Sequence, residues 1–163
     1  RANYGLNINL SYKGFSFSTL FQGATRFDMY LGSVLMMSDA NTGSSPTYEF
    51  QTDYWTPENT DAKFPRLLSS TGNNGSNNTV GSDFWLINGG YLRMRDIQVG
   101  YDFKRILLKK TSWITRLNVA LSGQNIFTIS EATKYGIDPE NGSANRYDYP
   151  NERVFAINFG IGF

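Results

Sequence analysis

The chain has 163 residues, of which 40% are hydrophobic, 15% aromatic and 18% charged, with a formal net charge of +1 and no Cys or His. This length suits one ordinary domain, and the aromatic content excludes a compositionally disordered chain. The missing Cys and His exclude disulfides, thiolate metal sites and histidine chemistry, and the small net charge gives no electrostatic case for a nucleic-acid partner.

Two strands joined by a tight turn are predicted at the start of the chain. Residues 4–12 alternate strictly between apolar and small polar side chains, and residues 15–22 do so with one exception, Leu20. A period of two is typical of a strand with two different faces. Lys13-Gly14 lies between the two stretches and predicts a turn.

Residues 23–90 interrupt the alternation. They are rich in Gly, Ser, Asn, Thr and Asp, and they contain three of the five prolines. Residues 26–37 are compatible with a short helix, which Gly32 would weaken. Residues 69–82 are almost all small and polar, which predicts a mobile loop tip. A connection of this length is unusual in a compact domain and indicates a functional loop.

Alternation resumes in three further stretches, residues 91–103, 116–126 and 153–163. A basic connector, 104–115, separates the first two, and a second irregular loop, 127–150, precedes the last. We therefore predict five strands. The pattern assigns one face of the third strand to Tyr91, Arg93, Arg95, Ile97, Val99, Tyr101 and Phe103.

Two architectures explain such strands: a soluble sandwich with its apolar face on a core, and a membrane barrel with its apolar face in lipid. The alternating stretches run about 9–11 residues, the length of a tilted membrane strand, and the polar face carries little charge. Aromatic residues end the apolar faces, and short and long connectors alternate. We predict an all-β transmembrane antiparallel β-barrel over 1–163, with extracellular loops at about 23–90 and 127–150.

Five strands are too few to close a barrel, because the smallest barrels have about 8 strands. Lipid does not tolerate the open edges of a sheet. The chain is therefore expected to lie beside other strands. The chain does not begin with Met, so we expect it to be a piece of a longer protein. It has no stretch of 18 apolar residues, so we expect no transmembrane helix within this piece.

Four stretches of the chain resemble the SusC-like (SusC/RagA-type) family of TonB-dependent outer-membrane transporters. They cover most of the chain: YWTPEN at 54–59 with FPR at 64–66, residues 84–93, SGQN at 122–125, and residues 149–163. The sequence departs from the family pattern at Asn88 and at Ile126-Phe127. The resemblance implies about five C-terminal strands of a plugged barrel of about 22 strands.

The resemblance also implies a function and its partners. The protein is expected to import a nutrient, an oligosaccharide first and a peptide second, across the bacterial outer membrane. Its implied partners are the rest of the barrel and its plug, a SusD-like surface lipoprotein, the lipid bilayer, and the TonB complex through a missing N-terminal part. No enzymatic activity, metal or cofactor is expected. The alternatives are a secreted β-sandwich carbohydrate-binding module and a structural outer-membrane barrel without transport.

Five residues are candidates for contact with the substrate or the lipoprotein lid: Tyr54, Trp55, Arg66, Trp85 and Arg93. Aromatic rings suit the apolar face of a sugar, and a guanidinium suits an anionic group. Packing within the loop or rim is the alternative for each residue. The resemblance further implies an assembly signal in the last strand, carried by Phe155, Phe159 and Phe163.

Overall fold

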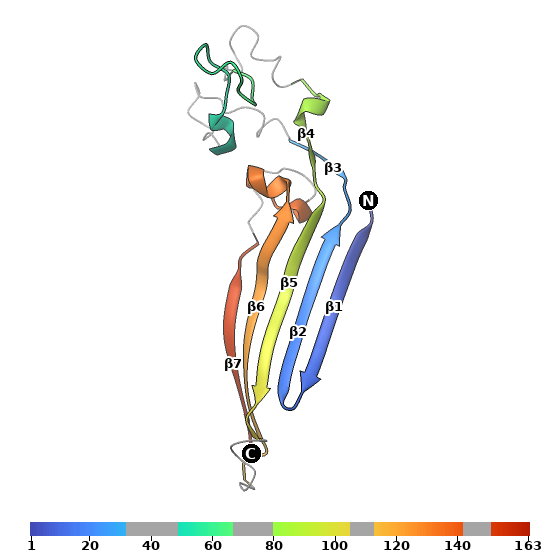
Figure 1. Ribbon diagram of the computed structural model, residues 1–163, viewed down its shortest axis with the longest axis vertical. Helices are drawn as coiled ribbons and strands as arrows, with labels where there is room; N and C mark the ends of the chain where they lie inside the picture. Colours follow the sequence, from blue (N-terminus) through green and yellow to red (C-terminus); the bar gives the residue numbers. More distant parts are fainter. Residues whose placement is uncertain (32–48, 67–79, 105–112, 142–150) are drawn as a thin grey trace. The chain divides into compact units, whose positions relative to one another are not determined.

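The computed structural model describes residues 1–31, 49–66, 80–104, 113–141 and 151–163. They form two compact units (Figure 1). Unit 1 consists of Arg1–Thr25, Tyr91–Ile129 and Asn151–Phe163, and unit 2 consists of Arg26–Gly90 and Ser130–Pro150. Within the described ranges, no helix has the length and apolar character needed to span a membrane.

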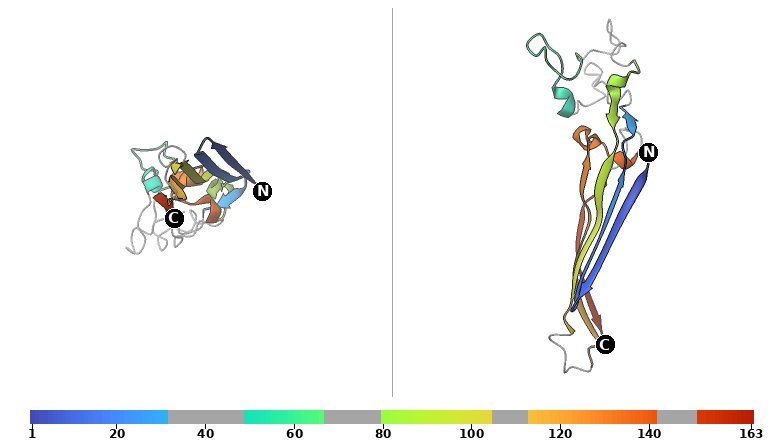
Figure 2. Two further views of the ribbon diagram at one scale, coloured as in Figure 1. Left: turned by 90° about the horizontal axis from the view of Figure 1, so that it is seen from below. Right: turned by 45° about the vertical axis from the view of Figure 1, so that its right-hand side comes forward.

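Unit 1 is a five-stranded sheet in the order β1-β2-β5-β6-β7. The arrows in Figure 1 show neighbouring strands running in opposite directions, and Figure 2 shows the same long strands from a second side. The predicted all-β antiparallel architecture is therefore confirmed. The strand bounds are β1 (Asn3–Tyr12), β2 (Phe15–Ala24), β5 (Tyr91–Asp102), β6 (Arg116–Ser130) and β7 (Val154–Gly162).

The turn between β1 and β2 lies at the predicted position. Lys13 and Gly14 have φ angles of 48° and 90°, and Tyr12 pairs with Phe15 across the turn. Two consecutive residues with positive φ are typical of a type I′ hairpin, whose twist matches that of the strands. The backbone N–H of Asp102 donates to the Gly14 carbonyl at 2.8 Å, which joins the turn to β5.

The strand register places side chains of the same kind beside one another. Leu10 pairs with Phe17, which pairs with Val99. One residue further along, Asn9 pairs with Ser18, which pairs with Gln98. Because side chains alternate across a strand, these rows lie on opposite faces of the sheet. The sheet therefore has one apolar and one polar face, as the alternation predicts.

A β-bulge in β5 corrects the predicted faces of this strand. Leu20 of β2 pairs with Asp96, but the next residue, Phe21, pairs with Met94, so Arg95 is an extra residue. An extra residue reverses the alternation beyond it. Arg93 therefore pairs with Gln22 on the polar face. The assignment of Tyr91 and Arg93 to the face of Ile97 and Val99 was wrong.

β6 also departs from the sequence prediction, because it continues to Ser130 instead of ending at Ile126. Asn125 has a positive φ of 52°, and its side-chain amide donates to the Glu152 carbonyl at 3.0 Å. This local irregularity interrupts the period of two without ending the strand. Beyond it, the ring of Phe127 lies 6.4 Å from that of Phe21 on β2.

Unit 2 contains a two-stranded antiparallel sheet of β3 (Asp28–Tyr30) and β4 (Leu86–Asn88). The helix predicted over 26–37 is therefore wrong in its described part, while residues 32–37 lie outside the described ranges. Met29 and Leu31 are buried at 1% exposure, while Asp28 and Tyr30 are exposed. The partner strand is distant in sequence, so local propensity did not reveal this pairing.

Unit 2 has a hydrophobic core of its own, although the sequence predicts irregular loops there. Among the described residues of this unit, four short 3₁₀ helices accompany the strand pair: η1 (Glu49–Thr52), η3 (Asp83–Trp85), η4 (Ala132–Tyr135) and η5 (Pro139–Asn141). The core joins both stretches of the unit and consists of Met29, Leu31, Phe64, Trp85, Ile87, Ala132 and Tyr135. The predicted mobile tip at 69–82 lies mostly outside the described residues.

Candidate functional site

The apolar face of the sheet is exposed in unit 1. Leu6 and Leu121 are each 56% exposed, and Ile157 and Phe159 are 61% and 72% exposed. A soluble sheet would cover such a face with a second layer. Contiguous exposed apolar surface marks contact with a partner or a membrane. Four of the strands have 9–12 residues, which matches the length needed to cross a bilayer at a tilt.

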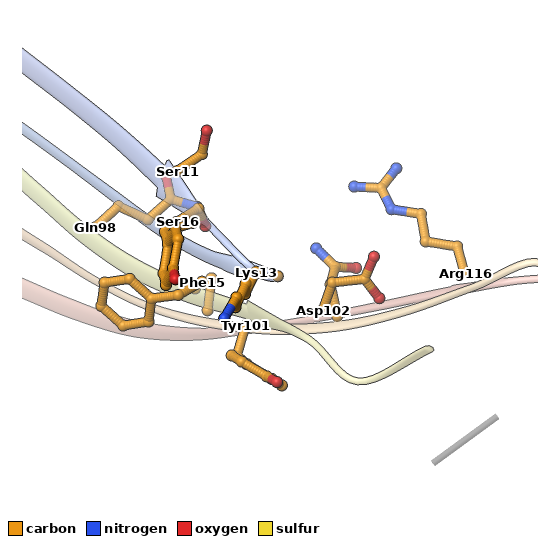
Figure 3. A pocket seen from close by; sticks show the side chains of 13 residues that line it. Ser11, Lys13, Phe15, Ser16, Gln98, Tyr101, Asp102 and Arg116 are labelled. Atoms are coloured by element: carbon orange, nitrogen blue, oxygen red, sulfur yellow. The ribbon is translucent and has the colours of Figure 1, made fainter. Parts of the chain in front are cut away.

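The polar face carries a hollow of about 450 Å³ near the β1–β2 turn. Its lining includes Ser11, Ser16, Asp102 and Arg116. Figure 3 shows Ser11 and Arg116 pointing to one side of the ribbon and Tyr101 to the other. A wet surface suits these side chains, because hydroxyl and charged groups need hydrogen-bond partners. This face fits the lumen of a barrel better than its lipid side.

Small residues shape the floor of this hollow. Asn118 lies over Gly160, where a Cβ atom would collide with the Asn118 side chain. Gly100 plays the same role toward the Ser16 hydroxyl, which would lie 2.6 Å from a Cβ atom. Asn118 Oδ1 is buried and has no hydrogen-bond partner among the described residues. Water or another donor on this face would satisfy that oxygen.

The motif at residues 54–59 forms a closed turn in unit 2. Trp55 N–H donates to the Phe64 carbonyl at 2.9 Å, and Phe64 N–H donates to the Asp53 carbonyl at 3.1 Å. Thr56 and Asn59 exchange backbone hydrogen bonds of 3.3 and 3.0 Å. The YWTPEN and FPR stretches are therefore the two sides of one local structure.

Asn59 is the residue that closes this turn. Its side-chain amide donates to Asp53 Oδ1 and to the Tyr54 carbonyl, each at 3.3 Å. The other Asp53 oxygen accepts from Lys63 N–H at 3.3 Å. Asn and Asp are favoured in turns because their short polar side chains bond to nearby backbone groups. The turn fixes the backbone from which the Trp55 side chain projects.

We expect Asn59→Ala to loosen this turn by about 1 kcal/mol, because two side-chain hydrogen bonds are lost at an exposed site. Amide hydrogen exchange at Trp55 and Phe64 should become faster in the full-length protein. Thr60→Ala, at the next exposed position, is the matched control and should leave both rates unchanged. Unchanged exchange in the Asn59 variant would show that backbone bonds alone hold the turn.

Aromatic rings pack closely beside the turn. The Trp85 ring stacks on Phe64 with centroids 6.4 Å apart and an interplanar angle of 23°. Phe84 meets Trp85 edge-on at 4.8 Å and Phe64 edge-on at 6.4 Å. Such contacts stabilise a cluster beyond the area that they bury. Trp85 and Phe64 are 3% and 8% exposed, so these two rings belong to the core of unit 2.

A cavity of about 690 Å³ opens against this cluster. It is lined by Trp55, Ala62, Lys63, Phe64, Pro65, Arg66, Val80, Ser82, Phe84 and Trp85. Its size falls in the range of small-molecule sites, which are mostly apolar with a few polar groups. Trp55 is 37% exposed and Phe84 52% exposed, so both rings remain accessible. We call this cavity the aromatic pocket.

The structure brings three predicted site residues together and separates two. Trp55, Arg66 and Trp85 all line the aromatic pocket. Tyr54 packs half-buried against the core of unit 2. Arg93 lies in unit 1, where it is 2% exposed and its Nε donates to Thr128 Oγ1 at 2.9 Å. Contact of any of the five with substrate or lid remains a prediction.

Sequence reasoning missed three residues of this site. Phe84 was read only as part of a motif, although its ring is an accessible wall of the pocket. Asn59 and Asp53 close the turn that carries Trp55. The spacing of Asp53, Asn59 and the aromatic run is visible in the sequence, but only the paired backbone shows which groups meet.

The three residues predicted to carry the assembly signal lie along β7 and at its end. Phe155, Phe159 and Phe163 are 74%, 72% and 79% exposed. Phe163 stacks on Trp113 with ring centroids 6.0 Å apart and an interplanar angle of 14°. The recognition of these residues by an insertion machinery remains a prediction.

The exposed apolar face, the polar face and the length of the strands define a section of a transmembrane β-barrel wall. The comparisons with known proteins then show what the chain is similar to. No family model matches the chain. Over 98% of its length, the chain is 24%, 29% and 24% identical to the TonB-dependent receptors P3, P39 and P26 of Formosa agariphila. It spans only 16%, 16% and 17% of their lengths.

Solved structures give the same result for the fold. The RagAB peptide transporter matches 96% of the chain with a TM-score of 0.66 and 21% identity, and the match covers 16% of that chain. The open-open RagAB peptide importer matches 98% with a TM-score of 0.69 and 20% identity, again over 16% of that chain. The chain is therefore similar in sequence to one part of TonB-dependent receptors, which are outer-membrane proteins of Gram-negative bacteria, and its fold matches part of RagAB.

Proposed function

We propose that the full-length protein imports a nutrient across the outer membrane with energy from the TonB complex. This chain supplies five strands of its barrel wall. The observation that carries the proposal is the exposed apolar face of a sheet whose sequence resembles that of TonB-dependent receptors. The edges of this sheet are β1 and β7, and further strands of the same receptor pair with them and close the barrel around a plug.

A SusD-like surface lipoprotein is the proposed partner on the extracellular side. Unit 2 then belongs to the extracellular loops, at about 23–90 and 127–150. Its hydrophobic core supports this assignment, because a packed unit can present a stable surface to a partner. Tyr54, Trp55 and Arg66 are the proposed contact residues for the substrate or the lid, and the likeness to RagAB supports a paired assembly.

The proposed cargo is an oligosaccharide. Trp55 and Phe84 offer accessible rings at the aromatic pocket, and such rings suit the apolar faces of sugars. A peptide is the second candidate, because the neighbouring RagAB structures are described as peptide importers.

The proposal is tested in cells that lack the full-length receptor and in cells that carry it. Uptake of fluorescent oligosaccharides should require the receptor and should stop when a protonophore removes the energy source of TonB. A receptor that inserts normally but supports no uptake of sugars or peptides would be a structural barrel. Recovery of the protein from the culture medium, soluble without detergent, would instead favour a secreted carbohydrate-binding sandwich.

A further inference from the structure

We propose that the aromatic pocket binds an acidic sugar ring, one that carries a carboxylate, with Arg66 as the residue that selects the charge. This inference rests on the proposed import of an oligosaccharide and makes its substrate class more specific. It is carried by two features of the pocket, accessible aromatic rings and cationic side chains, which together match a ring with one apolar face and one anionic group.

The aromatic part of the pocket is fixed before a ligand arrives. Phe84 is held edge-on against both Trp85 and Phe64, and these two rings are buried in the core of unit 2. Trp55 projects from the turn that Asn59 and Asp53 close. Rings that are already fixed lose little conformational entropy on binding, so less of the favourable contact free energy is offset.

The charge of the pocket has one sign. Its described lining contains two charged side chains, Lys63 and Arg66, and both are cationic. The acidic groups of the neighbouring turn do not line it, and Asp53 is bonded to Asn59 and to the backbone of Lys63. A cavity with cations on its wall favours an anionic ligand over a neutral ligand of the same shape.

Arg66 is assigned the ligand contact because of the chemistry of its guanidinium, since Lys63 and Arg66 both lie at exposed positions. The Lys63 ammonium donates to the Tyr135 hydroxyl at 2.7 Å and lies over the rings of Tyr135 and Phe64, at 5.0 and 5.5 Å from their centroids. Arg66 lies at an exposed position of the same wall. A guanidinium presents a planar fork of donors that matches both oxygens of a carboxylate.

These features predict how a uronic-acid ring would be recognised. Its apolar face would contact Trp55 and Phe84, and its carboxylate would accept hydrogen bonds from Arg66. A methyl ester keeps the ring and an acceptor oxygen but removes the charge, so it would keep the ring contact and lose the charge-assisted part of the contact with Arg66. The difference between the acid and its ester therefore isolates the contribution of Arg66.

Titration calorimetry on the purified full-length receptor tests this inference, with a panel of uronic-acid oligosaccharides and their methyl esters. We expect the receptor to bind at least one acid about tenfold more tightly than its ester, as a charge-assisted hydrogen bond provides. Arg66→Gln should remove this preference and leave the affinity for the ester within about twofold. Trp55→Ala should weaken both ligands. Lys134→Gln, an exposed cation outside the pocket, is the matched control and should change neither.

Three results would overturn the inference. Binding of neutral oligosaccharides without any preference for acids would remove the charge selectivity while leaving oligosaccharide import intact. An equal loss for acid and ester in Arg66→Gln would make Arg66 a packing residue. Tight binding of peptides with a free carboxyl terminus, weakened by amidation and by Arg66→Gln, would assign the pocket to a peptide. A receptor that binds neither class would contradict the proposed function itself.

Discussion

Leu121→Arg in the full-length receptor is expected to lower the free energy of unfolding by about 2–4 kcal/mol, the cost of a cation near the middle of a lipid-facing strand. Leu121 is 56% exposed although it lies on an inner strand of the sheet, and it pairs with Ile157 on the apolar face. Its surroundings therefore offer lipid and no protein partner for the new charge. The measurement is denaturant unfolding of the receptor in lipid bilayers.

Gln124→Arg is the matched control on the same strand. Gln124 is exposed on the opposite, polar face of β6 and pairs with Val154. If that face lies in a wet lumen, the charge keeps its hydration, and the cost should stay below about 1 kcal/mol. Equal costs at the two positions would contradict a membrane barrel, because the two faces of a strand in lipid differ in solvent.

Phe163→Ala is expected to lower the amount of receptor in the outer membrane several-fold while leaving the melting temperature of the inserted protein almost unchanged. The Phe163 ring is 79% exposed, so its removal exposes little new surface. Loss of its stacking on Trp113 contributes only about 0.5–1.5 kcal/mol. The effect should therefore appear in assembly, through the proposed recognition of β7, and not in stability.

Trp113→Ala separates these two roles of Phe163. It removes the same ring contact, with centroids 6.0 Å apart, and leaves β7 intact. The amount of this variant in the outer membrane should be close to normal. If the two variants lower the amount of receptor in the outer membrane to the same degree, assembly depends on the stacked ring pair and not on Phe163 alone. A normal amount of Phe163→Ala with a clearly lower melting temperature would make Phe163 a packing residue.

The strands of the sheet were predictable because each obeys one local rule. Period-two alternation located five strands, and Lys13-Gly14 located their first turn, where the positive φ of the second residue favours glycine. The faces of β1, β2 and β7 followed directly from that alternation. Nothing beyond neighbouring residues was needed for these predictions.

The bulge in β5 was not predictable by the same rule. The extra residue Arg95 reverses which face of the sheet the following side chains occupy. It does not change the kinds of residue in the strand, so the sequence pattern gives no sign of the reversal. The Thr19 hydroxyl donates to the Asp96 carbonyl at 3.0 Å beside the bulge, a contact between strands that are distant in sequence. Faces beyond such a site are set by pairing and not by local pattern.

In the candidate site too, local features were predictable from the sequence and contacts between distant segments were not. The sequence singled out Trp55, Arg66 and Trp85, which line one pocket, because aromatic rings suit a sugar and a guanidinium suits an anionic group. It did not reveal that Trp85 belongs to a core with Met29 and Tyr135, since those contacts join distant segments. Nor did it place Arg93 in the sheet beside Thr128, because that required the corrected phase of β5.

The central claim, that one face of this sheet meets lipid, is tested most directly by scanning β7 with single cysteines. The chain contains no Cys, so each introduced thiol is the single position in the chain that a thiol-reactive fluorophore labels. In the full-length receptor, with any other cysteines removed, a fluorophore at Phe155, Ile157 or Phe159 should be quenched by lipid-borne quenchers. At Ala156 and Asn158, quenching should require a water-soluble agent. Equal response to both quenchers along the strand would contradict the account.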